Sequence, residues 1–202
     1  DLTGNTYQAA FTESSPVSTF NSGNQILLNA SGSLQIDNRI LTYMDNQWKA
    51  ENEFSWSDLT GKTNVTAVYP VYPDLDYVQE NLYKNNSLED ILYVKDEFPT
   101  GNSIHLQFKH LFSLLTLHLE GNLQTYFQKI EVTCPAVSSI IPKSAEIVLA
   151  DNGTHTTTIA QVSPFGNYSF IVPPVGNMVI AINMVTNGKK YTTQLETKSF
   201  TG

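Results

Sequence analysis

The sequence has few charged residues, a single arginine, a single cysteine and no long apolar run, and each scarcity excludes a class of protein. The net charge is −8 and the lysines are scattered, with Arg39 the one arginine, so we expect no nucleic-acid partner. Cys134 cannot form an internal disulfide and is predicted to be a small buried side chain. No run approaches the roughly 18 apolar residues of a membrane-spanning helix, and no signal peptide is visible, so we expect any export signal to have been removed.

Strand-forming residues dominate what is present. Tyr, Phe, Thr, Val and Ile are plentiful, whereas charged residues make up only 15% of the 202 positions. Glycine-containing turn dipeptides recur, and short strands separated by tight turns every 8–12 residues or so are typical of β-sandwiches. The sequence therefore predicts an all-β fold. The turn dipeptides are Ser22-Gly23, Ser31-Gly32, Thr60-Gly61, Thr100-Gly101, Asn152-Gly153 and Asn187-Gly188.

Two Asn-Gly pairs predict hairpins, because this dipeptide adopts the positive φ angles of tight hairpin turns. "NGKKYTTQLET" is the expected return arm of a hairpin that turns at Asn187-Gly188. "AEIVLADNGTHTTTIA" is predicted to form a second hairpin around Asn152-Gly153.

The interval from Pro70 to Asp96 breaks the strand rhythm. It contains two prolines and many Asp, Glu and Asn residues, so we expect a long excursion with one helical turn. Its apolar side chains would be buried; they are Leu75, Tyr77, Leu82, Leu88 and Leu92. The domain boundary is predicted just beyond it, at residues 97–103, which divides the chain into domains 1–100 and 101–202.

The stretch "LQFKHLFSLLTLHLEG", residues 106–121, is the most apolar passage and is ambiguous by pattern. Its apolar residues have the i, i+3, i+4, i+7 spacing of one helix face, but several leucines also occupy alternate positions, which would place them on one face of a strand. Leucine favours the helix slightly. Because the rest of the chain is strand-rich, context favours a strand with a bulge near His110.

No pattern indicates catalysis or metal binding. The four histidines, His105, His110, His118 and His155, do not have the spacing of zinc ligands. No G-x-S-x-G nucleophile elbow occurs. Asp74 and Asp76 lack the glycine and closing glutamate of a calcium loop. We therefore expect no catalytic residue, no metal and no cofactor.

Several motifs occur in an order that resembles a known family. "DILY" (residues 90–93) is followed by "LQFKHLFSLL" (residues 106–115), and "FNSGNQILL", "DNQWKAENEFSW", "AVYP" and "VPPV" occupy matching places. Together they resemble the fimbrillin family of surface lipoproteins and pilus subunits of Gram-negative anaerobes. The resemblance implies two tandem transthyretin-like (Greek-key) β-sandwich domains. Residues 106–119 would open the second domain as a strand, with His110 buried and hydrogen-bonded to neighbouring backbone.

The resemblance also implies a function. The chain would be a structural or accessory fimbrial (pilus) subunit that assembles with other subunits by donor-strand exchange. It would contribute to adhesion to host or bacterial surface ligands. "YTTQLETKSFTG" is the candidate donor segment. The expected location is the fimbrium at the outer membrane, through a lipid anchor that is not present in this chain.

A glycan-binding surface lipoprotein is the alternative, because exposed planar rings stack on sugar faces. Its candidate stacking residues are Trp48, Trp56, Tyr69, Tyr72 and Tyr77. Phe54 and Trp56 share a strand parity, however, and an inward-facing pair is the preferred interpretation for them. Exposure of the rings distinguishes the two functions.

Overall fold

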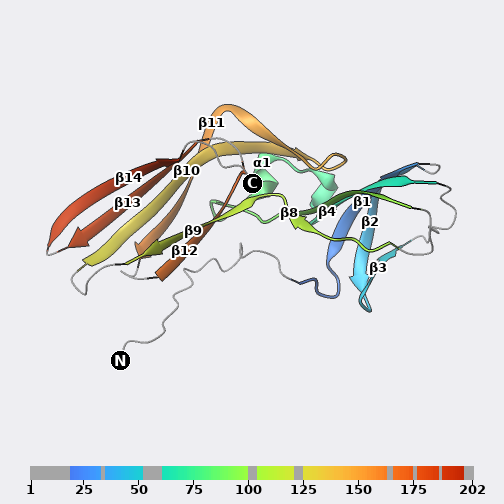
Figure 1. The fold of residues 1–202 in the computed structure, drawn as a ribbon, viewed down its shortest axis with the longest axis horizontal. Coiled ribbons are helices and arrows are strands. Elements are labelled where there is room, and N and C mark those ends of the chain that lie inside the picture. Colours follow the sequence, from blue (N-terminus) through green and yellow to red (C-terminus); the bar gives the residue numbers. More distant parts are fainter. Residues whose placement is uncertain are drawn as a thin grey trace.

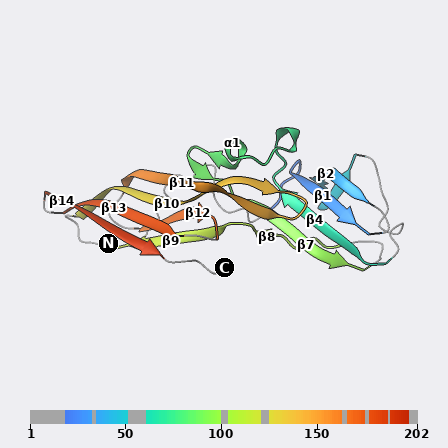
Figure 2. The ribbon, with the colours of Figure 1, turned by 90° about the horizontal axis from the view of Figure 1, so that it is seen from above.

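The computed structural model describes residues 19–32, 35–51, 61–99, 104–120, 125–162, 166–174, 177–186 and 188–197 of the chain. Strands dominate these residues and their pairings are antiparallel, so the fold is all-β as the sequence predicts. The molecule is elongated. A six-stranded sheet lies at one end, and a four-stranded sheet packed on a two-stranded sheet lies at the other (Figures 1 and 2).

The six-stranded sheet is buried on both faces near its middle. Its order is β3-β2-β1-β4-β7-β8. Successive side chains of a strand point to opposite faces, yet five consecutive residues from Ile26 to Ala30 are buried. Both faces of β1 are therefore covered by other parts of the chain. The strands are β1 (Gln25–Ser31), β2 (Ile36–Met44), β3 (Gln47–Ala50), β4 (Thr63–Tyr69), β7 (Leu92–Phe98) and β8 (Lys109–His110).

One face of this sheet is covered by residues 104–108, which precede β8. Ile104, Leu106 and Phe108 pack against the core that contains Ile26 and Leu28. These residues follow the predicted boundary at 97–103, and β8 itself pairs with β7. The start of the predicted second half thus completes the sheet of the first half.

The opposite face is covered by the excursion, which contains one helical turn as predicted. Tyr77, Leu82 and Leu88 are buried and share one core with Leu27 of β1. The excursion therefore packs as a third layer. Its elements are η2 (Pro73–Leu75), α1 (Gln79–Leu82), β5 (Tyr83–Lys84) and β6 (Ser87–Leu88).

The other end of the molecule is a two-layered sandwich. The four-stranded sheet has the order β11-β10-β13-β14, and the two-stranded sheet pairs β12 with β9. Ile130, Val132 and Ile180 of the larger sheet share a core with Tyr168 and Phe170 of the smaller one. The strands are β9 (Ser113–Leu119), β10 (Thr125–Ile141), β11 (Glu146–Val162), β12 (Gly166–Val172), β13 (Met178–Thr186) and β14 (Lys189–Thr197).

The hairpin of β10 and β11 joins the two ends. Val132 of β10 lies in the sandwich core, whereas Val137, five residues further on, lies in the core beneath the excursion. At the hairpin tip, Lys143 Nζ is 2.6 Å from a carboxylate oxygen of Asp37 on β2. One continuous pair of strands therefore contributes to both cores.

Asn152-Gly153 is not a hairpin turn, so that prediction is wrong. Residues 146–162 form one strand, and the turn before it spans residues 142–145. Asn152 has the positive φ of 55° that an Asn-Gly turn uses, but the pairing with β10 shifts register at this place. The pair therefore lies in a β-bulge. A Cβ on Gly153 would lie 2.7 Å from the Cβ of Ala150, so the bulge requires glycine.

The other Asn-Gly hairpin is confirmed. Thr186 of β13 pairs directly with Lys189 of β14, and Gly188 has a φ of 74°. Such a φ is accessible to glycine without the steric cost that a side chain brings. The stretch from Lys189 to Thr197 is therefore a paired strand, whereas the remaining residues of the candidate donor segment, 198–202, lie outside the described ranges.

Residues 106–119 are extended and not helical, as context predicts. They do not form one long strand, however. β8 and β9 are separated by Leu111 and Phe112, whose buried side chains lie in the core under the excursion. β8 pairs in the six-stranded sheet and β9 pairs in the two-stranded sheet. This passage therefore leads from one end of the molecule to the other.

Candidate functional site

Two of the five candidate stacking residues pack into an aromatic cluster on the six-stranded sheet. The ring of Phe20 lies 5.0 Å from that of Trp48 and 5.3 Å from that of Tyr69, with interplanar angles of 75° and 79°. Phe108 and Tyr43 complete the cluster. Because these rings meet edge to face, they form a packed corner and not a flat platform for a sugar.

Tyr72 and Tyr77 lie in a different core, beneath the excursion. Only 6% and 2% of their surfaces are exposed, and their rings pack edge to face 5.0 Å apart. Burial raises the pKa of both phenols, so both remain hydrogen-bond donors. Tyr72 donates to Glu89 and Tyr77 to the carbonyl of Pro70. Neither ring is available for stacking in this structure, and Trp56 lies outside the described residues.

His110 has a partner that the sequence did not predict. Its Nδ1 lies 3.0 Å from both carboxylate oxygens of Asp90, whose side chain is only 5% exposed. The His110 side chain is 48% exposed, so the expectation of a buried imidazole bonded to backbone is wrong. The reason is that β8 pairs at the edge of its sheet, where one face of the imidazole remains in solvent. The contact joins the two motifs "DILY" and "LQFKHLFSLL".

The other side chains that could act as nucleophiles or metal ligands do not form a cluster within the described residues. Within the described ranges, no group of three or more His, Cys, Asp or Glu side chains could hold a metal ion. Burial raises the pKa of the Cys134 thiol to about 11, which keeps it protonated and unreactive. His118 is exposed, and hydrogen bonds to Asn167 and Glu120 raise its pKa. His155 binds the carbonyl of Asn86 and packs on the ring of Tyr83.

The sandwich has an incompletely covered inner face along β14. Ile180 of β13 pairs with Leu195 of β14, and Tyr191 lies four residues before Leu195, so the side chains of Ile180, Leu195 and Tyr191 share one face. Ile180 is buried in the sandwich core, yet 53% of Leu195 and 47% of Tyr191 are exposed. The opposing sheet has two strands among the described residues, against four in the larger sheet, and it leaves Leu195 and Tyr191 about half uncovered. The sequence did not predict that Leu195 and Tyr191 are exposed, because a strand has the same alternation of side chains whether or not its inner face is covered by another sheet.

Comparison with known proteins identifies the family. A family model described as fimbrillin-like matches residues 6–201 of the chain. The chain belongs to the fimbrillin-like family. No curated protein matches it. This fimbrillin-like chain is also similar to a solved structure, a proposed cell adhesion protein of Bacteroides fragilis NCTC 9343. The two share 9% identity with a TM-score of 0.40, over 99% of this chain and 82% of the other.

Family membership supports a fimbrial subunit at the cell surface. The fimbrillin-like family is structural and not enzymatic. In the described part of this fimbrillin-like chain, no helix is long and apolar enough to span a membrane.

Proposed function

We propose that this fimbrillin-like chain is a structural or accessory subunit of a fimbrium, that it joins other subunits by strand exchange, and that it contributes to adhesion. The observation that carries the strand-exchange step is the open inner face of β14 opposite the two-stranded sheet. An unpaired strand edge offers N–H and C=O groups to an incoming strand. Burial of the exposed apolar side chains beside that edge stabilises the added strand.

The place of the incoming strand follows from burial within the two-stranded sheet. The inner side chains of β12, such as Tyr168 and Phe170, are buried at 2% and 1% exposure. Those of β9, such as Leu115 and Leu117, are only partly buried. The uncovered side of the sandwich therefore borders β9, whose outer edge has no partner strand among the described residues. An added strand beside β9 would cover Leu195 and Tyr191.

The gain from such an added strand is appreciable. Full burial of an apolar side chain contributes about 1.5–3 kcal/mol, so covering the exposed half of one side chain contributes about 1 kcal/mol. The donor contributes its own apolar residues and a ladder of backbone hydrogen bonds. These terms favour a lasting joint after the ordering cost of the donor strand is subtracted.

We also propose that the chain comprises two transthyretin-like units divided near residues 97–103. The six-stranded sheet uses residues 25–98 apart from β8, whereas both sheets of the sandwich use residues 113–197. This separation supports the division. β8 and residues 104–108 act as the connection that holds the second unit on the first.

The test is charge substitution on the two faces of β14. Leu195→Asp places a carboxylate on the open inner face, whereas Gln194→Asp places one on the outer face of the same strand. In cells that produce each variant, immuno-electron microscopy of surface filaments and gel analysis of unheated oligomers measure incorporation. We expect Leu195→Asp to abolish incorporation and Gln194→Asp to leave it unchanged. Equal incorporation of both variants would contradict strand exchange at this face.

The glycan-binding alternative has less support from the predicted stacking residues. Trp48 and Tyr69 are partly buried and meet their neighbours edge to face, and Tyr72 and Tyr77 are buried. Stacking at these rings is therefore not part of the function proposed here.

A further inference from the structure

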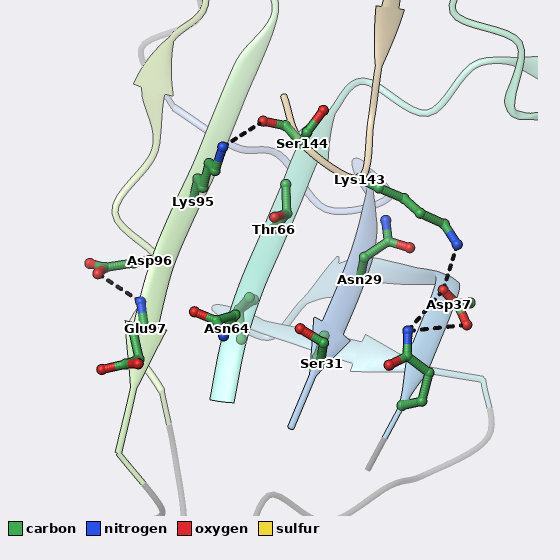
Figure 3. Close-up of a pocket in the computed structure, with 13 residues that line it drawn as sticks. Asn29, Ser31, Asp37, Asn64, Thr66, Lys95, Asp96, Glu97, Lys143 and Ser144 are labelled. Atoms are coloured by element: carbon green, nitrogen blue, oxygen red, sulfur yellow. Dashed lines mark hydrogen bonds and ion pairs between the residues drawn. The ribbon is translucent and has the colours of Figure 1, made fainter. Parts of the chain in front are cut away.

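A polar groove opens on the six-stranded sheet beside the tip of the β10–β11 hairpin (Figure 3). Its volume is about 500 Å³, within the range of roughly 300–1,000 Å³ typical of small-molecule sites. Two rows of side chains cross β1, β4 and β7 on this face, as the strand register dictates. The first row is Asn29, Thr66 and Lys95, and the second is Ser31, Asn64 and Glu97.

Two polar groups beside the groove are buried without a hydrogen-bond partner among the described residues. They are Nδ2 of Asn29 and Oγ of Ser144. Asn29 is only 7% exposed, and its Oδ1 accepts the backbone N–H of Asn38 at 2.9 Å. This bond fixes the orientation of the amide, and Figure 3 shows the nitrogen pointing away from Asp37 toward the hairpin tip. An unpaired buried donor carries a desolvation cost that an acceptor on a ligand would remove.

The charged side chains around the groove already have partners. Lys143 pairs with Asp37 and Lys62 pairs with Glu97, both at 2.6 Å. Lys95 donates to the carbonyl oxygen of Ser144 at 3.2 Å. In the described ranges, no group of three or more His, Cys, Asp or Glu side chains could bind a metal ion. Asp96, which also lines the groove, accepts the backbone N–H of Glu97 at 2.8 Å. Three carboxylates and three ammonium groups therefore surround the groove, and it offers no net charge to an anion or a cation.

The unused hydrogen-bonding capacity belongs to neutral groups. Besides Asn29 and Ser144, the side chains of Ser31, Asn64 and Thr66 line the groove and make no side-chain hydrogen bond within the described residues. Amides and hydroxyls supply donors and acceptors together. A ligand that matches them must itself alternate donors and acceptors without net charge.

We propose that this groove binds a neutral saccharide. Hydroxyl groups of a sugar both donate and accept, so a ring in the groove matches the amide of Asn64 and the hydroxyls of Ser31 and Thr66. A sugar hydroxyl that reaches Asn29 would accept its unpaired N–H. The site lies on a sheet face, away from β14. Sugar binding here is consequently independent of strand exchange and would add recognition to the proposed structural role.

Titration followed by NMR tests the proposal on the intact chain. The probes are the methyl glycosides of glucose, galactose, mannose and N-acetylglucosamine, each added to about 50 mM so that millimolar affinities are measurable. N-acetylneuraminic acid and calcium chloride are the charged probes. Shifts of the backbone amides of β1, β4 and β7 and of the Asn29 and Asn64 side-chain amides report binding in the groove.

Two variants and one control define the site. Asn64→Ala removes an exposed amide from the groove, and Asn29→Asp removes the free N–H while keeping the oxygen that accepts from Asn38. Each should weaken sugar binding about fivefold or more, the effect of one lost hydrogen bond. Gln194→Ala, on β14, should leave binding unchanged.

Saturable shifts in the groove with at least one neutral sugar, weakened in both variants, would support the proposal. Three results would overturn it: no shift with any neutral glycoside, binding of a charged probe alone, or sugar-induced shifts confined to the cluster of Trp48 and Tyr69. Loss of fimbrial incorporation in Leu195→Asp with normal sugar binding would show that the two sites are separate.

Discussion

Replacing His110 with alanine removes a hydrogen-bond partner from the buried carboxylate of Asp90. Nδ1 of His110 lies 3.0 Å from both oxygens of a side chain that is 5% exposed. The contact joins β8 to the residue two positions before β7. Its loss therefore weakens the point where the chain leaves the six-stranded sheet for the sandwich.

The structure sets the size of the effect. A hydrogen bond to a charged group contributes about 1.5–3 kcal/mol. Two features reduce this value: His110 is half exposed, so water can replace part of its bond, and Asp90 has a further interaction besides His110. We expect His110→Ala to lower the free energy of unfolding by about 1–2 kcal/mol.

A double-mutant cycle separates this contact from the loss of side-chain packing. Urea unfolding of the wild type, His110→Ala, Asp90→Asn and the double variant gives the coupling energy, for which we expect about 1 kcal/mol. His118→Ala is the matched control, because His118 is exposed and its partners Asn167 and Glu120 are exposed. That control should leave the unfolding midpoint unchanged.

The reasoning would be refuted by additive effects. If the double variant loses the sum of the two single losses to within about 0.3 kcal/mol, the two side chains do not stabilise each other. If the wild type retains zinc after dialysis and His110→Ala does not, this would also contradict a purely structural role for the histidine.

Three further predictions concern two buried groups, the Cys134 thiol and the Tyr72 hydroxyl. Because burial raises the Cys134 pKa from 9.0 to about 11, the thiol should react with Ellman's reagent at pH 8 only after unfolding, and fast reaction in the native state would contradict its burial. The same shift stabilises the fold below a pH of about 9, and this contribution should be lost as the pH rises toward about 11. Tyr72→Phe removes the 2.5 Å bond to Glu89 and should cost about 1 kcal/mol of unfolding free energy, whereas Tyr191→Phe at an exposed position should cost nothing measurable. Equal unfolding midpoints for the two tyrosine variants would show that the Tyr72 hydroxyl is not part of the core.

Local pattern determined much of this fold. The scarcity of charge, the β-branched and aromatic residues and the spacing of turns predicted an all-β chain, and the order of the motifs identified the family. The turn at Gly188 and a buried excursion after Pro70 were also predictable, but the excursion ends before Leu92, because residues 92–98 form β7 of the six-stranded sheet and not the irregular stretch predicted up to Asp96. Each of these rests on interactions between residues near in sequence, where backbone preference and alternation are sufficient.

Pairing between distant residues decided the rest. Asn152-Gly153 has the chemistry of a turn, but the register with β10 and the docking of Asn86 on His155 and Thr157 make it a bulge within one strand. The Asp90 partner of His110 depends on β8 pairing with β7. The groove around Asn29 exists because Ser31, Asn64 and Glu97 align across three strands. Alternation places a side chain on one face or the other of its strand; only the packing of the sheets determines whether that face is covered, as it is over Ile180 and is not over Leu195.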